Sequence, residues 1–375
     1  MAVPGAKTFS PAEGSTIAPN LTGKIRVSAD RLTAFVAACF VHNDMPKEDA
    51  WISARGLVLA DLVGHESHGV SNNLAGFYLP DLESGVINPH PNIRITHQSP
   101  STATWEADRG MGFVVGHRAM TDALERAEKV GSGFAAVGNS RHYGMAQIYS
   151  RMALERDMIG FSMTNGVTPG VVPFGGFEPK LGTNPISVAV PCGEEPPFVL
   201  DMATTTAAFG KIQNYQRDGK KIPPTWALDR TGHPTTDPEE ATAAVKLLTF
   251  GGSPEGAGHK GYGLGVWVDI MCGALSGWGF IGKPGEEENV NHFFGAWRVD
   301  AFVPIERHKA LMDERMRDLR STPPAPGFAR VMVAGQPEFE NLVDRRVNGV
   351  PLHPTVIEML SGYAKKYNLP DDLTD

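Results

Sequence analysis

The stretches KLGTNPISVAVP (residues 180–191) and FVLDMATTTAAFGKI (residues 198–212) decide how this chain folds. Each contains a short apolar run, which predicts a buried strand. The two runs are only a few residues apart, and such close neighbours favour antiparallel pairing over a parallel crossover. A polar loop with Thr183 precedes the first strand, and the second ends near Asp201. Polar side chains at the ends of buried strands commonly form ligand sites, because the strands hold them in place.

Length and composition limit the kind of protein that this chain can be. Its 375 residues exceed one simple core and predict two domains. The net charge of −8 argues against a nucleic-acid partner, because phosphates would be repelled. The three cysteines are far apart, which excludes a disulfide framework and a thiolate zinc site and fits a cytoplasmic location. We see no secretory signal and no membrane-spanning stretch, so we expect no membrane partner.

Strand and helix patterns alternate unevenly along the chain. That alternation predicts an α/β fold, and the uneven spacing argues against a doubly wound parallel sheet. We therefore predict a largely antiparallel or mixed sheet in a domain over residues 104–299. A helical or mixed domain, built from both chain ends, is predicted over residues 1–103 and 300–375. Clear local signals predict helices at 28–41, 47–62 and 354–367, and a late strand at 329–333.

The segment 65–69, His-Glu-Ser-His-Gly, directly follows a predicted helix. A hydroxyl beside an imidazole, here Ser67 and His68, can tune a proton donor if a carboxylate such as Asp201 completes the relay. A polar cluster at a helix end is the structural alternative. A metal site formed by His65, His68 and Asp201 is disfavoured, because zinc hydrolases carry His-Glu-x-x-His on a helix and glycines interrupt the helix here. We predict no metal.

Other glycine and histidine clusters have two interpretations each. His142 follows a predicted strand, and Gly144 would let a ligand approach closely, but a structural histidine fits equally well. The loop before His259 and Lys260 could hold a pyrophosphate at a helix N-terminus or simply enter the helix. Gly110, Gly112 and Gly116 lack the spacing of a Rossmann fingerprint, so we interpret them as a turn and a helix start.

Several motifs taken together are more specific than any one of them. In chain order they are Ser67-His68-Gly69-Val70, Asn139-Ser140-x-His142-x-Gly144, Gly182-Thr-Asn-Pro185, Asp201-Met-Ala-Thr, Gly210-Lys211-Ile212, Ile222-Pro223-x-x-Trp226-Ala227 and His259-Lys-Gly-Tyr-Gly-Leu264. With them the chain resembles, over nearly its full length, the malate/L-lactate dehydrogenase family of the second type. That family includes ureidoglycolate, sulfolactate and 2,3-diketogulonate dehydrogenases and piperideine-2-carboxylate reductases.

The resemblance implies a non-Rossmann α/β fold, NAD or NADP bound in the domain 104–299, and a homodimer with the active site near the subunit interface. It implies that His68 gives or takes the substrate proton, supported by Ser67 and Asp201. His142 would lie beside nicotinamide and substrate, and is the acid/base in some accounts of the family. The predicted cofactor contacts are Gly144, Ala146, Phe198, Val199, Leu200, Met202, Ala203, His259, Lys260, Gly335 and Gln336.

The chain departs from the family pattern just after His68. Members commonly carry an Arg in Ser-His-Gly-Val-x-Arg that holds the substrate carboxylate, whereas this chain has Asn72 and Asn73, with extra residues before Gly85. An Asn cannot replace a bidentate, charge-assisted Arg. We therefore expect that another cation binds the carboxylate or that the substrate differs. The predicted substrate contacts are Asn72, Arg141 and Thr183.

The function that we predict is hydride transfer between NAD(P) and a small 2-oxo or 2-hydroxy acid, or a cyclic imino acid. His68 would be the proton donor or acceptor. Two other classes stay open at this point: the metal-dependent hydrolase, which stoichiometric zinc would favour, and a non-catalytic module that binds the cofactor without turnover.

Overall fold

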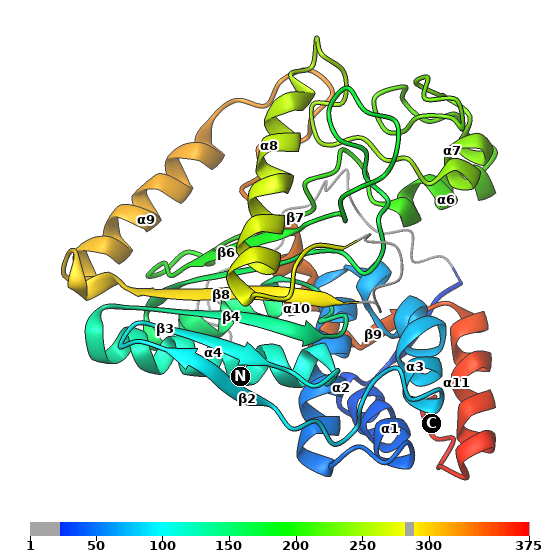
Figure 1. Ribbon diagram of the computed structural model, residues 1–375, viewed down its shortest axis with the longest axis horizontal. Coiled ribbons are helices and arrows are strands. Elements are labelled where there is room, and N and C mark those ends of the chain that lie inside the picture. The colour runs from blue at the N-terminus through cyan, green and yellow to red at the C-terminus, as the bar shows by residue number, and fades with distance from the viewer. Residues whose placement is uncertain (1–22, 282–288, 375) are drawn as a thin grey trace.

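The computed structural model describes residues 23–281 and 289–374, and its centre is a seven-stranded sheet (Figure 1). The strand order is β2–β3–β4–β8–β5–β6–β7. β3 and β4 run parallel, and the other neighbours are antiparallel. The predicted α/β class with a mixed, largely antiparallel sheet is confirmed. The strands are β2 (Arg94–Gln98), β3 (Thr102–Glu106), β4 (Ser132–Ser140), β5 (Met158–Thr164), β6 (Ile186–Val190), β7 (Phe198–Met202) and β8 (Val290–Arg298).

The two apolar runs at 180–212 form the predicted antiparallel hairpin of β6 and β7. Its register pairs Ser187 with Asp201 and Val190 with Phe198. β6 also pairs with β5, so β7 is the edge strand of the sheet. The ladder to β6 therefore fixes the backbone of Asp201 one residue before β7 ends.

Helices cover both faces of the sheet (Figure 1). On one face α4 (Gly112–Val130) connects the parallel strands β3 and β4. It packs directly on β4, because a Cβ at Gly133 would lie 1.9 Å from the carbonyl oxygen of Ala123. The other face carries α8 (Gly258–Asp269), the π-helical segment η4 (Ile270–Ala274) and α9 (Ile305–Ser321).

Segments from both chain ends form a helical layer beside the sheet, with the first and last helices side by side (Figure 1). Ser28 caps the first of these helices, as predicted, by accepting a hydrogen bond from the Arg31 N–H. The second helix ends at Gly64, which has a φ of 94°. A division into domains 1–103 with 300–375 and 104–299 stays a prediction. The elements of this layer are β1 (Ile25–Val27), α1 (Ala29–His42), α2 (Lys47–Val63), α10 (Gln336–Asn348), β9 (Val350–Leu352), which pairs with β1, and α11 (Pro354–Tyr367).

Shorter elements connect these layers. The segment after α2 contributes most to the histidine cluster, because a single turn there leads into a π-helix of nine residues. No helix within residues 23–281 and 289–374 has the length and apolar character needed to cross a bilayer. The elements are η1 (Glu66–His68), the π-helix η2 (Val70–Tyr78), α3 (Leu79–Glu83), α5 (Gln147–Ser150), η3 (Arg151–Arg156), α6 (Phe209–Arg217), α7 (Pro238–Ala244) and η5 (Val299–Ala301).

The strand predicted at 329–333 is wrong, since this segment is irregular. It runs beside the edge strand β7, where the Val199 N–H donates to the Ala334 carbonyl over 3.3 Å. A ladder cannot continue from there, because Gly335 has a φ of 89° and turns the chain into α10. The apolar signal at 329–333 thus reflects packing against a sheet edge.

Candidate active site

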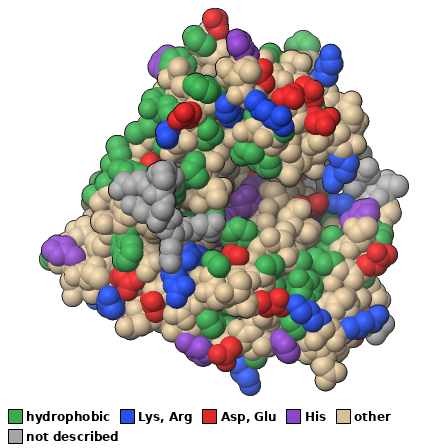
Figure 2. All heavy atoms as spheres, turned by 45° about the vertical axis from the view of Figure 1, so that its right-hand side comes forward, with side chains coloured by type: hydrophobic (Ala, Val, Ile, Leu, Met, Phe, Trp, Pro, Cys, Tyr) green, Lys and Arg blue, Asp and Glu red, His purple; other side chains and the backbone are tan. Residues whose placement is uncertain are grey.

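Two histidines from distant segments meet at one end of the sheet. His68 is the last residue of η1, and His142 lies in the loop after β4. Their ring centroids are 6.0 Å apart and the rings are inclined by 23°. Both side chains are half-buried. The structure therefore brings together the two imidazoles that the sequence singles out, and Figure 2 shows histidine side chains inside a hollow of the molecular surface.

His68 has the neighbour that the sequence predicts. The Ser67 hydroxyl lies 2.9 Å from His68 Nδ1. Burial, and secondarily the positive charge of His65, lowers the pKa of His68 to about 4. His68 is thus neutral near pH 7, and its Nδ1 lies within hydrogen-bond distance of a hydroxyl.

His142 is held on several sides. The Tyr78 hydroxyl, at the last residue of η2, lies 2.6 Å from His142 Nδ1. The Phe77 ring approaches it edge-on at 5.3 Å. Burial, and secondarily His68 and then His292, lowers the pKa of His142 to about 3. This imidazole is also neutral at physiological pH.

Asp201 contacts partners other than those predicted. Its Oδ2 accepts a hydrogen bond of 2.9 Å from the Gln147 backbone N–H. Burial raises the pKa of Asp201 to about 6, and the charge of His65 opposes that rise. Asp201 is therefore coupled to His65, whereas Ser67 is coupled to His68. The three-residue relay of Ser67, His68 and Asp201 stays a prediction.

His65 is the member of the histidine group whose pKa is raised. Its Nε2 lies 3.1 Å from Glu338 Oε1, in the first turn of α10. Burial alone would lower the pKa of His65, but the hydrogen bond to Glu338 and the charge of Asp201 outweigh it and raise that pKa. Within residues 23–281 and 289–374, no group of three or more His, Cys, Asp or Glu side chains is arranged to hold a metal ion. The hydrolase alternative thus finds no ligand set in the described part of the chain.

Asn184 fixes the loop that carries Thr183. Asn184 is fully buried and has a φ of 42°, which is unusual for a residue other than glycine. Its Nδ2 donates to the Gly265 carbonyl over 2.8 Å, which ties the loop to α8. The Thr183 carbonyl accepts hydrogen bonds from the backbone and hydroxyl of Thr204, just after β7. The loop before β6 and the end of β7 are thus held as one unit.

Close backbone packing also positions the loop of His142. At Gly112, the first residue of α4, a Cβ would lie 2.3 Å from the Arg141 carbonyl and 2.4 Å from the His142 carbonyl. At Gly144, where φ is 76°, a Cβ would lie 2.3 Å from the Phe113 ring. Gly112 and Gly144 therefore serve tight packing of the loop against α4, in agreement with the interpretation of the 110–116 glycines as a helix start.

The predicted cofactor contacts fall into separate groups. Gly144 and Ala146 flank the His142 loop, and residues 198–203 lie on and just after β7. Gly335 packs on β7, since a Cβ there would lie 2.9 Å from the Val199 backbone nitrogen. His259 and Lys260 lie apart from these, in the exposed first turn of α8, at the end of the helix away from the sheet (Figure 1).

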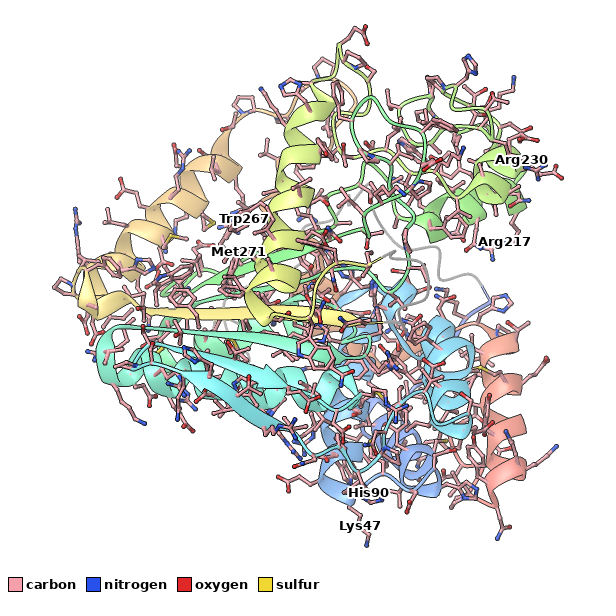
Figure 3. All side chains as sticks on the ribbon, in the orientation of Figure 1. Lys47, His90, Arg217, Arg230, Trp267 and Met271 are labelled. Atoms are coloured by element: carbon pink, nitrogen blue, oxygen red, sulfur yellow. The ribbon has the colours of Figure 1, made fainter. Side chains whose placement is uncertain are left out.

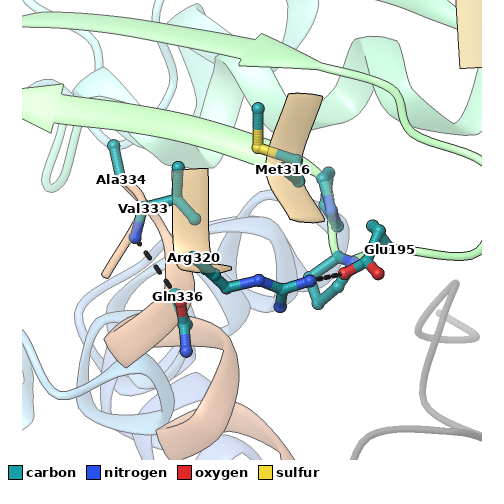
Figure 4. Close-up of a pocket in the computed structure, with 8 residues that line it drawn as sticks. Glu195, Met316, Arg320, Val333, Ala334 and Gln336 are labelled. Atoms are coloured by element: carbon teal, nitrogen blue, oxygen red, sulfur yellow. Dashed lines mark hydrogen bonds and ion pairs between the residues drawn. The ribbon is translucent and has the colours of Figure 1, made fainter. Parts of the chain in front are cut away.

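Gln336 belongs to a small pocket between α9, the β6–β7 turn and the start of α10 (Figure 4). Its amide is already engaged: Nε2 donates to Glu340 Oε1 over 3.0 Å, and Oε1 accepts from the Val333 N–H over 3.4 Å. Arg320, in the same pocket, forms an ion pair with Glu195. The pocket is a packed junction of three elements, with its polar groups paired.

The predicted substrate contacts are also engaged in part. Asn72 Nδ2 donates to the Glu66 carbonyl over 2.6 Å, which closes the turn around His68. Arg141 is buried, and its Nε donates to the Val86 carbonyl over 2.9 Å. The Thr183 side chain is half-buried beside the end of β7. Of the three, only the Thr183 side chain forms no hydrogen bond to another described residue.

A larger groove of about 510 Å³ lies elsewhere, between α2, α4 and the strands β2 and β3. Its lining includes four carboxylates, which would repel an anionic acid substrate. Arg118 and Asp49 in this groove pair with each other at 2.7 Å. We therefore assign the chemistry to the histidine group rather than to this groove.

Sequence reasoning misses two members of the site. Tyr78 lies ten positions after His68 in a π-helix, and no local pattern predicts that geometry. Glu338, the partner of His65, lies in α10, far along the chain. The sequence suggests His65 itself only as a metal ligand. The one local signal is the Phe77-Tyr78 pair, which is typical of ordinary core.

Comparisons with known proteins give matches over most of the chain. A family model described as malate/L-lactate dehydrogenase matches residues 27–361. The chain is 42% identical over 347 residues to a malate dehydrogenase of Pyrococcus horikoshii, covering 91% of this chain and 95% of that protein. The solved structure of malate dehydrogenase from the same organism superposes with a TM-score of 0.84 at 39% identity, over 93% of this chain and 97% of that one.

Two further relatives carry different names. The chain is 39% identical over 307 residues to an L-sulfolactate dehydrogenase of Methanocaldococcus jannaschii, covering 80% of this chain and 86% of that protein. It is 30% identical over 345 residues to a ureidoglycolate dehydrogenase (NAD(+)) of Escherichia coli, covering 90% and 95%. Similar chains thus serve different acid substrates.

Proposed function

This chain belongs to the malate/L-lactate dehydrogenase family, and from that premise we propose that it is an oxidoreductase that transfers a hydride between NAD or NADP and a small 2-hydroxy acid. The reverse substrate is the 2-oxo acid, and a cyclic imino acid is included in the proposal. The observation that carries the proposal is the pair of neutral imidazoles, His68 and His142, whose ring centroids lie 6.0 Å apart. A nicotinamide group supplies the hydride acceptor, and the protein must supply the proton chemistry.

We assign the proton to His68. When a hydroxy acid is oxidised, the proton of its hydroxyl group would move to a ring nitrogen of His68, and the hydride would leave the carbon that bears this hydroxyl. Ser67 can accept the Nδ1–H of the resulting imidazolium, since its oxygen lies 2.9 Å away. Burial and His65 lower the pKa of His68 to about 4, and the negative charge of a bound substrate carboxylate would raise that pKa.

Asp201 and His65 would supply fixed charge rather than a proton. The carboxylates of Asp201 and Glu338 flank His65 and favour its protonated form. A cation held there can attract an anionic group of the cofactor or substrate without moving a proton. Arg141 and Asn72 would then contribute mainly by shaping the loops that carry His142 and His68, and Thr183 would contact the substrate.

The site fits a nicotinamide cofactor in one testable respect. The Thr205 hydroxyl, three residues after β7, is buried, and no described residue lies within hydrogen-bond distance of it. Buried hydroxyls are normally paired, so an unpaired one beside a proposed cofactor segment is a natural contact for a ligand amide or hydroxyl. The predicted cofactor residues 198–203, with Gly335, would lie along the same edge strand. His259 and Lys260, in the first turn of α8, would contact the phosphates.

We infer that the protein is a homodimer through the outer face of α8 and η4. Trp267 in α8, Ile270 in η4 and Leu275 directly after η4 have exposed fractions between 40% and 51%. Figure 3 labels Trp267 and Met271 one above the other on this helix. Large exposed apolar patches commonly mark protein interfaces, and a second copy is the occupant that the family resemblance implies. Replacing Trp267 and Ile270 by Asp should give a monomer in sedimentation analysis, and an unchanged dimer would contradict the assignment.

The decisive experiment is a spectrophotometric assay of NADH and NADPH oxidation with pyruvate, oxaloacetate, sulfopyruvate and piperideine-2-carboxylate. His68→Ala should lower kcat by about 10²- to 10⁴-fold, the usual contribution of a general acid or base, while cofactor binding persists. His90→Ala is the matched control, because His90 is exposed at the molecular surface (Figure 3) and pairs with Asp44 rather than with a member of the histidine group. Wild-type turnover in the His68→Ala protein would remove the assignment, and no turnover of any substrate by the wild-type protein would remove the proposed function.

A further inference from the structure

The π-helix η2 links the two histidines of the site. It starts two residues after His68, and it ends at Tyr78, whose hydroxyl reaches His142. The first turn of η2 is held against α2, because the Val70 N–H donates to the buried Asp61 carboxylate over 2.7 Å. π-helical turns are rare and occur frequently at functional sites. The position of the Tyr78 hydroxyl therefore depends on the same segment that positions His68.

The hydrogen bond between Tyr78 and His142 has a definite direction. Tyr78 is fully buried, and burial raises the pKa of its phenol well above the usual value, so the hydroxyl keeps its hydrogen. The Gly144 backbone N–H slightly favours the ionised phenol, but burial outweighs this effect. The phenol hydrogen then needs an acceptor, and His142 Nδ1 lies 2.6 Å away. Tyr78 is the donor and Nδ1 the acceptor.

A neutral imidazole that accepts at Nδ1 must carry its hydrogen on Nε2. The ring cannot easily turn over to exchange the two nitrogens, because Phe77 and Tyr78 pack against it at centroid distances of 5.3 and 5.8 Å. The titratable groups that face His142 are Tyr78, His68 and His292. None of the three is an anion that would favour a second proton on the ring.

We propose that Tyr78 is a positioning residue that locks His142 as a neutral Nε2–H donor, so that His142 hydrogen-bonds the substrate while His68 alone exchanges the proton. The inference rests on the proposed function for the identity of the reaction. A fixed neutral donor can stabilise charge that develops on a substrate oxygen without itself changing protonation state. The two histidines thus have different tasks, and the phenol of Tyr78 sets the difference.

Side-chain amides separate the two roles of His142. The amide nitrogen of Gln can reach roughly where Nε2 lies, whereas that of Asn lies nearer to Nδ1. The lock predicts that His142→Gln keeps kcat within about tenfold of wild type with the same pH profile, and that His142→Asn and His142→Ala lose about 10²- to 10³-fold, as expected when a charge-stabilising donor is removed. Equal inactivity of the Gln and Ala variants, with loss of one limb of the pH profile, would overturn the proposal and make His142 the proton carrier.

Tyr78→Phe tests the lock itself. It should lower kcat by about 10- to 100-fold, the usual effect of removing the group that orients a working histidine. Tyr149→Phe is the control for the loss of a buried phenol, since the Tyr149 hydroxyl is equally buried and donates to the Tyr143 carbonyl rather than to an imidazole. The control should lower the melting temperature and leave kcat near wild type. Equal kcat losses in the two variants would reduce Tyr78 to a structural role.

A measurement without turnover keeps this inference separate from the proposed function. In full-length protein labelled with ¹⁵N-histidine, long-range ¹H–¹⁵N spectra distinguish a bare from a protonated ring nitrogen, and His142→Gln assigns the signals. We expect bare Nδ1 and protonated Nε2 from about pH 6 to 8, and a mixture of tautomers in Tyr78→Phe. An Nδ1–H tautomer in the wild-type protein, or no change in the variant, would refute the lock even in an active enzyme.

Discussion

Asp61 is the buried charge beneath the His68 turn, and replacing it by Asn gives a quantitative test of the structure. Asp61 has no exposed surface, and Gly69 packs so closely that a Cβ there would lie 2.1 Å from Asp61 Oδ1. One oxygen accepts the Val70 N–H, and the other has no partner within hydrogen-bond distance among the described residues. Burial raises the pKa of Asp61 from 3.8 to about 7. The folded protein therefore binds this proton more tightly than the unfolded chain does.

The sign of the pH effect follows from that difference. Unfolding releases the Asp61 proton at any pH between the two pKa values, so protonated Asp61 stabilises the fold fully below about pH 4. That stability is lost as the pH rises towards 7. One pKa unit corresponds to about 1.4 kcal/mol, so the loss from pH 5 to 7 is about 3 kcal/mol. Asp61→Asn keeps an acceptor for Val70, has no charge to lose, and should escape this decline.

The assay is urea unfolding of both proteins at pH 5, 6, 7 and 8, and the quantity of interest is the difference in unfolding free energy. We expect the Asn variant to gain about 3 kcal/mol relative to wild type between pH 5 and 7, and little more by pH 8. Asp313→Asn is the control, because Asp313 accepts three backbone N–H groups, from Gly193, Glu194 and Glu195, and its pKa is lowered. Its difference should be flat over this range. A flat difference for Asp61→Asn as well would refute the buried-charge reasoning.

Two substitutions test the packing that positions the site. Gly133→Ala would place a methyl group 1.9 Å from the Ala123 carbonyl oxygen, so α4 must shift away from β4. Thermal unfolding should show that the unfolding free energy falls by about 1–3 kcal/mol, and an unchanged melting temperature would contradict the close packing. Asn184→Ala removes the hydrogen bond to Gly265 and replaces a residue type that tolerates the positive φ at this position, so the Thr183 loop should loosen. KM for the acid substrate should then rise by a larger factor than kcat falls, and equal effects on both would argue against a substrate role for that loop.

Strong local signals make much of the fold predictable. The 180–212 hairpin follows from two apolar runs too close for a crossover, and the helix over 354–367 has the predicted bounds because Pro354 and Asn368 mark its ends. The pairing of β1 with β9 has no such signal, because its hydrogen bonds join residues at opposite ends of the chain. Contacts of that kind depend on the finished packing and leave little trace in either segment alone.

Local sequence signals predict some residues of the site, whereas others depend on contacts between distant segments. His68 and His142 can be found because each follows an element end in a polar motif, and the structure brings their rings to 6.0 Å. Tyr78 cannot be found in this way, because the sequence of the π-helix shows no distinct apolar period and a tyrosine there is typical of a hydrophobic core. Asp201 is recognisable as a carboxylate at a strand end, but its electrostatic partner, His65, is placed by how the turn after α2 lies against α10.

The pKa shifts of the three histidines differ in sign: those of His68 and His142 are lowered, and that of His65 is raised. Burial keeps His68 and His142 neutral, whereas the Glu338 and Asp201 carboxylates favour a proton on His65, whose pKa they raise. A protonated His68 would therefore lie near His65, whose protonation is favoured, and would lose its proton readily until an anion enters the site. We expect a bound acid substrate to supply that anion and to raise the pKa of His68 towards the working pH. If His68 carries the proton as proposed, the substrate carboxylate would favour its protonated form, and a neutral substrate analogue of equal shape should bind without that effect.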